Sequence, residues 1–277
     1  MHSFDPGRYL RPLNIQPTGM SAAGGVAKPV DALLCDVYGT LLISGSGDIG
    51  AHHQDTDHPA ELVRLMRHFG TRISPAQLAS RMRDAVQADH VRAHSSGIEF
   101  PEVVIEKIWM DVLSLSSLES ARRFAVEYEL IVNPVWPMPG LRRLLHACRN
   151  SGVRLGIISN AQFYTPLIFQ WLLGRSFAEL GFDPNLLIFS YEQGRAKPSD
   201  ALFELARRRL AAKAVPPVRT AFIGNDMRND IAPAARQGFQ TILFAGDRRS
   251  LRLRENEVDV QPNLIITELA QLVDQLT

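Results

Sequence analysis

The chain has 277 residues, of which 45% are hydrophobic, so it can bury a substantial core in one large domain or in a domain with an inserted partner. Its formal net charge of +1 excludes the strongly basic surface that nucleic acid or an anionic membrane selects, and we expect neither as a partner. No stretch reaches the run of about 20 apolar residues that a membrane-spanning helix needs. The only cysteines, Cys35 and Cys148, argue against a disulfide framework and favour the reducing cytoplasm.

Residues 1–28 predict an irregular N-terminal arm. They are punctuated by proline and glycine, and they lack the apolar block of a secretory signal. We expect this arm to be mobile or to lie over the surface of the protein.

The next stretch, DALLCDVYGTLL at residues 31–42, predicts a buried strand that runs into a sharp turn. Four apolar or small residues lead into Asp36, and Gly39 and Thr40 follow shortly after it. Asp36 is therefore either a structural carboxylate at the end of a strand or a nucleophile.

Residues 46–133 predict an all-helical insertion. The polar, glycine-rich residues 43–58 have no sustained period and indicate a hinge or loop. The segments PAELVRLMRHFG and SPAQLASRMRDAVQADHVRAH then place apolar residues three and four positions apart, and the second begins with Ser74 as a candidate N-cap. Within the hinge, HHQDTDH has the residue types of a transition-metal site but no recognisable ligand spacing, so we interpret it as a solvated loop.

Residues 29–45 and 134–277 predict an α/β core with a doubly wound, Rossmann-like parallel sheet, because short β-rich runs alternate with helical segments. Ligand sites of such sheets lie at the carboxyl ends of the strands. The residues that follow the predicted strands include carboxylates, a hydroxyl, amides and an ammonium group, which together suit cleavage of a bond to an electron-poor centre. In chain order these residues are Asp36, Ser159, Asn160, Lys197, Asn225, Asp226 and Asp230.

This order resembles the four motifs of the haloacid dehalogenase (HAD) superfamily of hydrolases, which DVYGT, IISN, GRAKPSDALFELA and FIGNDMRNDI match in turn. The helical insertion resembles the cap that this superfamily carries behind its first motif. The resemblance implies an enzyme in which Asp36 attacks the substrate, Ser159 holds a substrate oxygen and Lys197 steadies the nucleophile. It also implies that Thr40 positions the nucleophile, and we include Asn160 of the second motif among the candidate catalytic residues.

The first motif departs from the phosphatases of this superfamily at one position. Most of them carry a second aspartate two residues after the nucleophile, which protonates the leaving oxygen, whereas this chain has Tyr38. A phenol with a pKa near 10 is a poor proton donor at neutral pH. Tyrosine at this position is typical of the 2-haloacid dehalogenases, whose halide leaving group needs no proton, so this motif alone favours dehalogenation.

The fourth motif favours a metal-dependent phosphatase instead. Dehalogenases of that branch work without a metal and generally lack an acidic pair, whereas this chain has Asp226 and Asp230. Together with Asp36 they offer the hard oxygen ligands that Mg²⁺ prefers. We expect Mg²⁺ at Asp36, at the backbone carbonyl of Tyr38 and at Asp226 or Asn225, with Asp230 binding the ion or orienting its water. A gapless match of the motif favours Asn225, but the spacing from Asp226 to Asp230 favours Asp226, which we prefer, with Asn225 as the alternative.

Phosphoryl transfer from a substrate whose leaving group is stable as an anion, such as an acyl phosphate or a phosphoanhydride, satisfies both motifs. The same residues are compatible with a slow phosphatase whose proton comes from the cap or from water. We therefore predict a Mg²⁺-dependent phosphatase acting on a small phosphorylated metabolite, with a 2-haloacid dehalogenase and a low-activity binding or regulatory relative as alternatives. Trp109 is expected in the core of the cap or in the lining of its pocket, and one cap arginine is expected to clasp an anionic substrate, from a set comprising Arg64, Arg67, Arg72, Arg81, Arg83 and Arg92.

Overall fold

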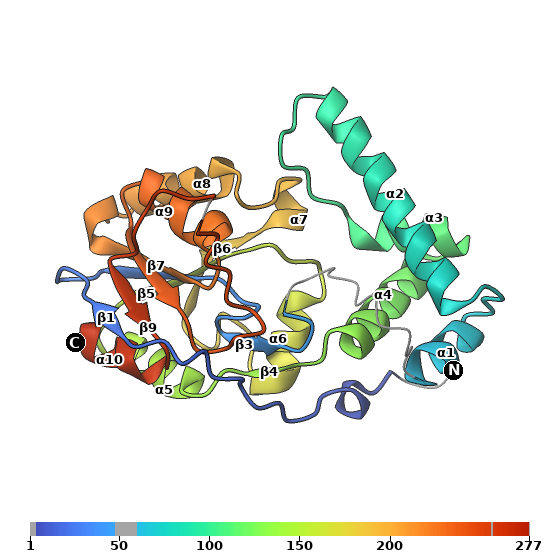
Figure 1. Ribbon diagram of the computed structural model, residues 1–277, viewed down its shortest axis with the longest axis horizontal. Helices are drawn as coiled ribbons and strands as arrows, with labels where there is room; N and C mark the ends of the chain where they lie inside the picture. Colours follow the sequence, from blue (N-terminus) through green and yellow to red (C-terminus); the bar gives the residue numbers. More distant parts are fainter. Residues whose placement is uncertain (1–3, 48–59, 256, 277) are drawn as a thin grey trace.

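The computed structural model describes residues 4–47, 60–255 and 257–276. A sheet flanked by helices forms one part of the molecule, and helices α1 to α4 form a group at its side (Figure 1). The histidine-rich segment at residues 52–58 lies outside the described residues. Within the described residues, no helix is both long and apolar enough to cross a membrane.

The central sheet has seven strands in the order β1-β9-β8-β7-β2-β5-β6. All neighbouring strands pair in parallel except β1, which runs antiparallel to β9. This arrangement confirms the predicted α/β fold. The strands are β1 (Ala23–Gly24), β2 (Ala32–Cys35), β5 (Arg154–Ser159), β6 (Phe182–Phe189), β7 (Thr220–Gly224), β8 (Gln240–Phe244) and β9 (Leu264–Ile266).

Strand β2 lies inside the sheet between β5 and β7, and every one of its residues is buried. Its side chains alternate between the two faces, because Leu33 and Cys35 belong to one apolar cluster and Ala32 and Leu34 to another. The other helices are α5 (Leu141–Asn150), α6 (Thr165–Leu173), α7 (Ser190–Gln193), α8 (Asp200–Ala211), α9 (Ala232–Arg236) and α10 (Ala270–Leu276), with 3₁₀ turns η1 (Pro6–Arg8) and η2 (Pro217–Arg219) and the π-helical turn η3 (Met227–Ile231).

The helical group consists of α1 (Ala60–His68), α2 (Pro75–Ser95), α3 (Ile105–Leu113) and α4 (Leu118–Val132). Helix α2 begins as its sequence predicts, because Ser74 and Gln77 form a reciprocal capping box. An aromatic cluster joins α3 to α4, with the Trp109 ring 4.8 Å from that of Phe124 and 4.7 Å from that of Tyr128.

Two short antiparallel strands, β3 (Leu42–Ser44) and β4 (Val135–Pro137), pair where the chain passes between the sheet and the helical group. They bring together segments on either side of the insertion. The assignment of residues 46–133 to a separate cap domain stays a prediction, and we use the word cap for α1 to α4.

The N-terminal arm lies against both parts of the molecule. The Tyr9 hydroxyl donates a hydrogen bond to Glu127 of α4 at 2.6 Å, and the Thr18 hydroxyl donates to the carbonyl oxygen of Ala245, just after β8. The arm also supplies the edge strand β1, which the sequence analysis does not predict. A two-residue strand containing a glycine carries no alternating pattern by which sequence reasoning recognises strands.

Candidate active site

Asp36 directly follows β2, so its carboxylate lies at the carboxyl edge of the central sheet. Its backbone N–H donates to the carbonyl oxygen of Ile223 on β7, which continues the strand pairing to this residue. The side chain is buried, and its Oδ1 atom accepts hydrogen bonds from Ser159 Oγ at 3.0 Å and from Lys197 Nζ at 2.7 Å. The structure thus brings these three predicted residues into direct contact.

A tight turn follows Asp36 and requires glycine. Gly39 has a φ of +82°, and a Cβ atom at this position would collide with the side chains of Ser250 and Asn225. The turn places Thr40 Oγ1 at 3.4 Å from Asp36 Oδ2, and Thr40 donates to Asn225 Oδ1 at 3.0 Å. Thr40 therefore links the nucleophile candidate to the first polar residue after β7.

Lys197 bridges two buried carboxylates. Its Nζ atom lies 2.7 Å from Asp36 Oδ1 and 2.5 Å from Asp230 Oδ1. Burial alone lowers the pKa of Lys197, but the charges of Asp230 and Asp36 outweigh burial and raise it, so the side chain is a cation. Asn160 holds the lysine backbone in place, because its side chain accepts a hydrogen bond from Lys197 N at 2.7 Å and donates to Lys197 O at 3.3 Å.

Asp230 is fully enclosed beneath the end of β7. Its Oδ2 atom accepts hydrogen bonds at 3.0 Å from the backbone N–H groups of both Asn225 and Asp226. Gly224 permits this close approach, since a Cβ atom there would collide with the Asp230 carboxyl group. Burial raises the pKa of Asp230 to about 7, although the neighbouring Lys197 opposes that rise.

The Asp226 side chain accepts hydrogen bonds from the residues that follow it in the chain. Its Oδ1 accepts hydrogen bonds from the backbone N–H groups of Arg228 and Asn229, and its Oδ2 accepts from Asn229 Nδ2 and from the Arg254 guanidinium. The carboxylate thus caps η3 and pairs with Arg254. These contacts occupy both oxygens of Asp226, which argues for Asn225 against the preference drawn from spacing, and the choice between the two ligands stays a prediction.

Tyr38 contributes its side chain to packing beside the site. Its hydroxyl lies 2.9 Å from Oγ1 of Thr165, the first residue of α6, and the ring is buried. Burial, together with the negative charge of Glu129, raises the pKa of Tyr38. The sequence analysis does not single out Thr165, because its proximity to Tyr38 arises only in the folded chain.

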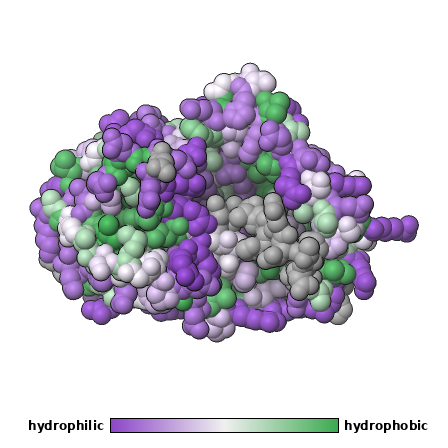
Figure 2. Space-filling view, in the orientation of Figure 1, coloured by the Kyte–Doolittle hydropathy of each residue, from purple (hydrophilic) through white to green (hydrophobic). Residues whose placement is uncertain are grey.

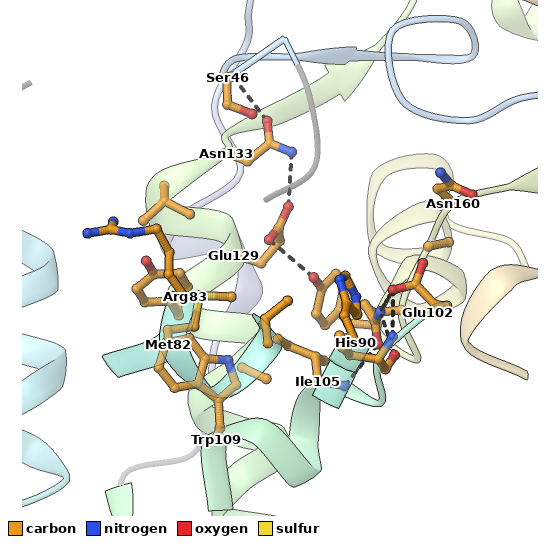
Figure 3. A pocket seen from close by; sticks show the side chains of 18 of the residues that line it. Ser46, Met82, Arg83, His90, Glu102, Ile105, Trp109, Glu129, Asn133 and Asn160 are labelled. Atoms are coloured by element: carbon orange, nitrogen blue, oxygen red, sulfur yellow. Dashed lines mark hydrogen bonds between the residues drawn. The ribbon is translucent and has the colours of Figure 1, made fainter. Parts of the chain in front are cut away.

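Two cavities adjoin these residues. The smaller, of about 50 Å³, is lined by Asp36, Lys197 and the polar residues that follow β7. The larger, of about 580 Å³, lies between the cap and the central sheet with its flanking helices, which we call the sheet domain. Asn160 lines both cavities. The surface is hollowed between α2 and the sheet domain (Figure 2), and Figure 3 shows the side chains that line the larger cavity.

The oxygens at the smaller cavity fit Mg²⁺ only as a mixture of carboxylate, amide and other oxygen ligands. Within the described part of the chain, no three His, Cys, Asp or Glu side chains are grouped to hold a metal ion. Hard oxygens are nevertheless close together, since the Thr40 hydroxyl contacts both Asp36 Oδ2 and Asn225 Oδ1. The single ammonium group of Lys197 also leaves the buried pair of Asp36 and Asp230 with a net negative charge when both are ionised.

Comparison with known proteins agrees with this arrangement. The family model of haloacid dehalogenase-like hydrolases matches residues 30–238, which is more than half of the chain. The chain belongs to this family of hydrolases, as its motifs predict.

Two curated relatives share part of the chain. One is a glyceraldehyde 3-phosphate phosphatase of Methanothermobacter thermautotrophicus, 31% identical over 147 residues, which cover 50% of this chain and 58% of that protein. The other is the haloacid dehalogenase-like hydrolase domain-containing protein 3 of Xenopus laevis, 26% identical over 188 residues, which cover 63% of this chain and 72% of that protein. The match to the phosphatase thus spans less than two thirds of its length.

Solved structures share the fold over most of the chain. A 2-haloacid dehalogenase from Pseudomonas syringae pv. tomato DC3000 superposes with a TM-score of 0.59 at 18% identity, covering 89% of this chain and 98% of that one. The HAD hydrolase YfnB from Bacillus subtilis, whose structure is bound to magnesium, superposes with a TM-score of 0.54 at 18% identity, covering 90% and 99%. At these identities the likeness concerns the fold.

Proposed function

We propose that the protein is a Mg²⁺-dependent phosphatase that acts on a small phosphorylated metabolite through Asp36 as nucleophile. The observation that carries this proposal is the unequal use of the two Asp36 oxygens. Oδ1 accepts from both Ser159 and Lys197, whereas among the described residues Oδ2 has only the longer contact with Thr40. A carboxylate held through one oxygen keeps lone pairs on the other for attack on an electrophile.

In the first step, Asp36 forms a bond to phosphorus while the bond from phosphorus to the leaving oxygen breaks. In the second step, water attacks the aspartyl phosphate, releases inorganic phosphate and restores the carboxylate. Lys197 holds Asp36 in position and offsets charge that develops on the phosphoryl group. Ser159 orients the same carboxylate oxygen.

Asp36, the backbone carbonyl of Tyr38 and Asn225 are the residues that would hold Mg²⁺. The bound ion would supply positive charge to the transferring phosphoryl group. Asp230 would stay with Lys197 and the backbone N–H groups that it already accepts from.

The leaving group is constrained by Tyr38. Its hydroxyl is engaged with Thr165 inside the protein, and its pKa is raised, so it is a poor donor of a proton to a leaving oxygen. This supports substrates whose leaving group is stable as an anion or only weakly basic.

A 2-haloacid dehalogenase is the second candidate, and Tyr38 is the observation that favours it. The same Asp36, Lys197 and Ser159 would then displace a halide from carbon, forming an ester that water hydrolyses. When both carboxylates are ionised, the buried pair of Asp36 and Asp230 outweighs the single charge of Lys197 and would repel an anionic haloacid, which counts against this candidate.

An activity screen separates the candidates. Purified protein would be incubated with alkyl phosphates, aryl phosphates, acyl phosphates and 2-haloacids, each with and without Mg²⁺, while released phosphate and halide are measured. The proposal expects phosphate release that needs Mg²⁺ and is absent in Asp36→Asn. Halide release without Mg²⁺ would assign the protein to the dehalogenases, and absence of both products would favour a binding or regulatory role.

A further inference from the structure

The larger cavity is the space available to the rest of the substrate when its phosphoryl group lies at Asp36. It is bounded by side chains of the cap and of the sheet domain, and Asn160 lines both this cavity and the smaller one. Its volume of about 580 Å³ is that of a pocket for a small organic molecule.

Two glutamates on the wall of this cavity join the cap to the sheet domain. Glu129 of α4 accepts a hydrogen bond from Asn133 Nδ2 at 2.9 Å and another from the Tyr164 hydroxyl at 3.1 Å (Figure 3). Glu102 accepts from Gln162 Nε2 at 3.1 Å and from Ser190 Oγ at 2.6 Å. Both glutamates therefore have their carboxyl oxygens in hydrogen bonds with neutral partners.

Both carboxylates lack a cationic partner. Within the described parts of the chain, neither Glu102 nor Glu129 forms a salt bridge. Arg83 also lines the cavity, but its guanidinium extends away from Glu102 (Figure 3). Burial lowers the pKa of His90, which favours its neutral form. When Glu102 and Glu129 are ionised, negative charge predominates on the inner wall.

Aromatic rings make up much of the remaining wall. Trp109, Tyr128 and Tyr164 line the cavity, and the rings of Trp109 and Tyr128 lie 4.7 Å apart. Ring faces attract cations, and they do so more strongly where water is excluded. Carboxylates next to aromatic rings complement an ammonium group better than they complement a neutral or anionic group.

A purely structural role explains these contacts less well. Holding the cap against the sheet domain requires only neutral acceptors and donors, which glutamine supplies without placing a charge in a buried site. Burial raises the pKa of both Glu129 and Glu102, because their charge is poorly stabilised away from water. A cation in the cavity would stabilise both carboxylates.

We propose that this cavity binds a cationic amine on the leaving-group side of the substrate, with Glu129 and Glu102 as the residues that recognise it. The inference rests on the proposed phosphatase function, and it gives the substrate class as a phosphorylated amine. An ammonium group near the leaving oxygen withdraws electrons and makes that oxygen less basic. Such a substrate needs less help from a general acid, which agrees with the engaged hydroxyl of Tyr38.

Binding of non-hydrolysable probes tests this inference without requiring turnover. Calorimetry would compare aminoalkyl phosphonates of two to six carbons with alkyl phosphonates of the same length, in the presence of Mg²⁺. We expect at least one aminoalkyl phosphonate to bind about tenfold more tightly than its alkyl counterpart, which corresponds to roughly 1.4 kcal/mol. Glu129→Gln should reduce this ratio to near one, whereas Glu119→Gln, at an exposed position of the same helix, should preserve it.

Circular dichroism would establish that the variants are folded, and Glu102→Gln provides a second variant if Glu129→Gln does not fold. Equal or weaker binding of every aminoalkyl phosphonate, no binding of any probe, or an unchanged ratio in the folded glutamine variants would overturn the inference. A preserved amine preference in protein that hydrolyses no phosphate ester would contradict the proposed function and leave the cavity as an amine-binding site.

Discussion

The hydroxyl of Tyr38 and Oγ1 of Thr165 lie 2.9 Å apart inside the protein, which ties the turn after the nucleophile to the first residue of α6. The phenol thus occupies the sequence position of a general acid while its hydrogen-bonding group is engaged with a neighbouring element. Tyr38 has the properties of a packing residue beside the site, and we propose that the chemistry of the site proceeds without its proton.

Tyr38→Phe should therefore have little effect on catalysis. We expect kcat/KM to change by less than about threefold. Without a general acid, kcat/KM should fall steeply as the pKa of the leaving group rises, and this dependence should be the same in both proteins. Loss of the buried hydrogen bond to Thr165 should lower the free energy of unfolding by about 1 kcal/mol. Rates with a series of aryl and alkyl phosphates, together with urea titrations, measure both effects.

Tyr191→Phe is the matched control, since the Tyr191 hydroxyl donates to the adjacent Glu192 at the surface. A flat leaving-group profile in the unmodified protein would mean that another residue donates the proton. A steeper profile in Tyr38→Phe would show that the phenol donates it after all.

Asp36→Asn should abolish turnover while preserving the fold. The amide keeps the shape of the side chain but is a far weaker nucleophile, so we expect kcat to fall by roughly 10³-fold or more. Asp31→Asn is the control, because Asp31 lies just before the same strand and pairs with Arg219 at 2.5 Å, remote from the carboxyl edge of the sheet. Residual activity of Asp36→Asn within tenfold of the unmodified protein would exclude covalent catalysis by this residue.

The contacts of Lys197 predict a large effect on stability. Lys197→Met leaves Asp36 and Asp230 together without their shared cation, and removal of one partner from a buried ion pair lowers the free energy of unfolding by about 3 to 5 kcal/mol. Lys213→Met removes a more exposed partner of Asp183 and should lower it by less than about 1 kcal/mol. Urea unfolding of both variants at neutral pH without Mg²⁺ makes the comparison, and similar losses would contradict the importance of the buried network.

Paired alanine variants decide between the two candidate ligands that the sequence leaves open. Asn225→Ala should raise the Mg²⁺ concentration needed for half-maximal activity by about tenfold or more, because it removes an oxygen that shares the Thr40 hydroxyl with Asp36. Asp226→Ala should lower the free energy of unfolding by about 1 kcal/mol through loss of the η3 cap, with the Mg²⁺ requirement unchanged. The reverse pattern would restore Asp226 as the ligand.

The sequence alone predicts the sheet and the positions of Asp36, Ser159 and Lys197, because residues that follow parallel strands gather at one edge. It does not predict which polar side chains already form hydrogen bonds with other parts of the protein. The four hydrogen bonds described for the Asp226 carboxylate depend on a π-helical turn and on Arg254, which lies far along the chain. Neither feature has a local pattern from which it can be recognised.

The position of Glu129 is, by contrast, unusual in the sequence itself. It lies in the last turn of α4, where the helix dipole disfavours a negative charge, and it lies among apolar residues in VEYELIV. An acid at such a position indicates a role in tertiary contacts or in binding. Its partner Tyr164 becomes identifiable only when the cap is packed against the sheet domain.

Glu129 also predicts how stability depends on pH. Burial raises its pKa above the value of 4.5 in the unfolded chain, so the folded protein holds this proton to a higher pH. As pH rises from the unfolded pKa through the folded pKa, the unfolded chain releases its proton first, and ionisation of Glu129 progressively destabilises the fold. Glutamine does not ionise. The Tm of Glu129→Gln minus that of the unmodified protein should therefore increase as pH rises through this range.

Thermal unfolding of both proteins between about pH 4 and about pH 8, at constant ionic strength, measures this difference. Loss of a hydrogen bond with Asn133 or Tyr164 would offset the two curves by a constant amount, so the test concerns the change with pH and not its absolute value. Glu119→Gln is the control, because its exposed side chain should give a curve parallel to that of the unmodified protein. A parallel curve for Glu129→Gln would show that burial does not raise the pKa of this carboxyl group, and it would remove one support for a cation-binding cavity.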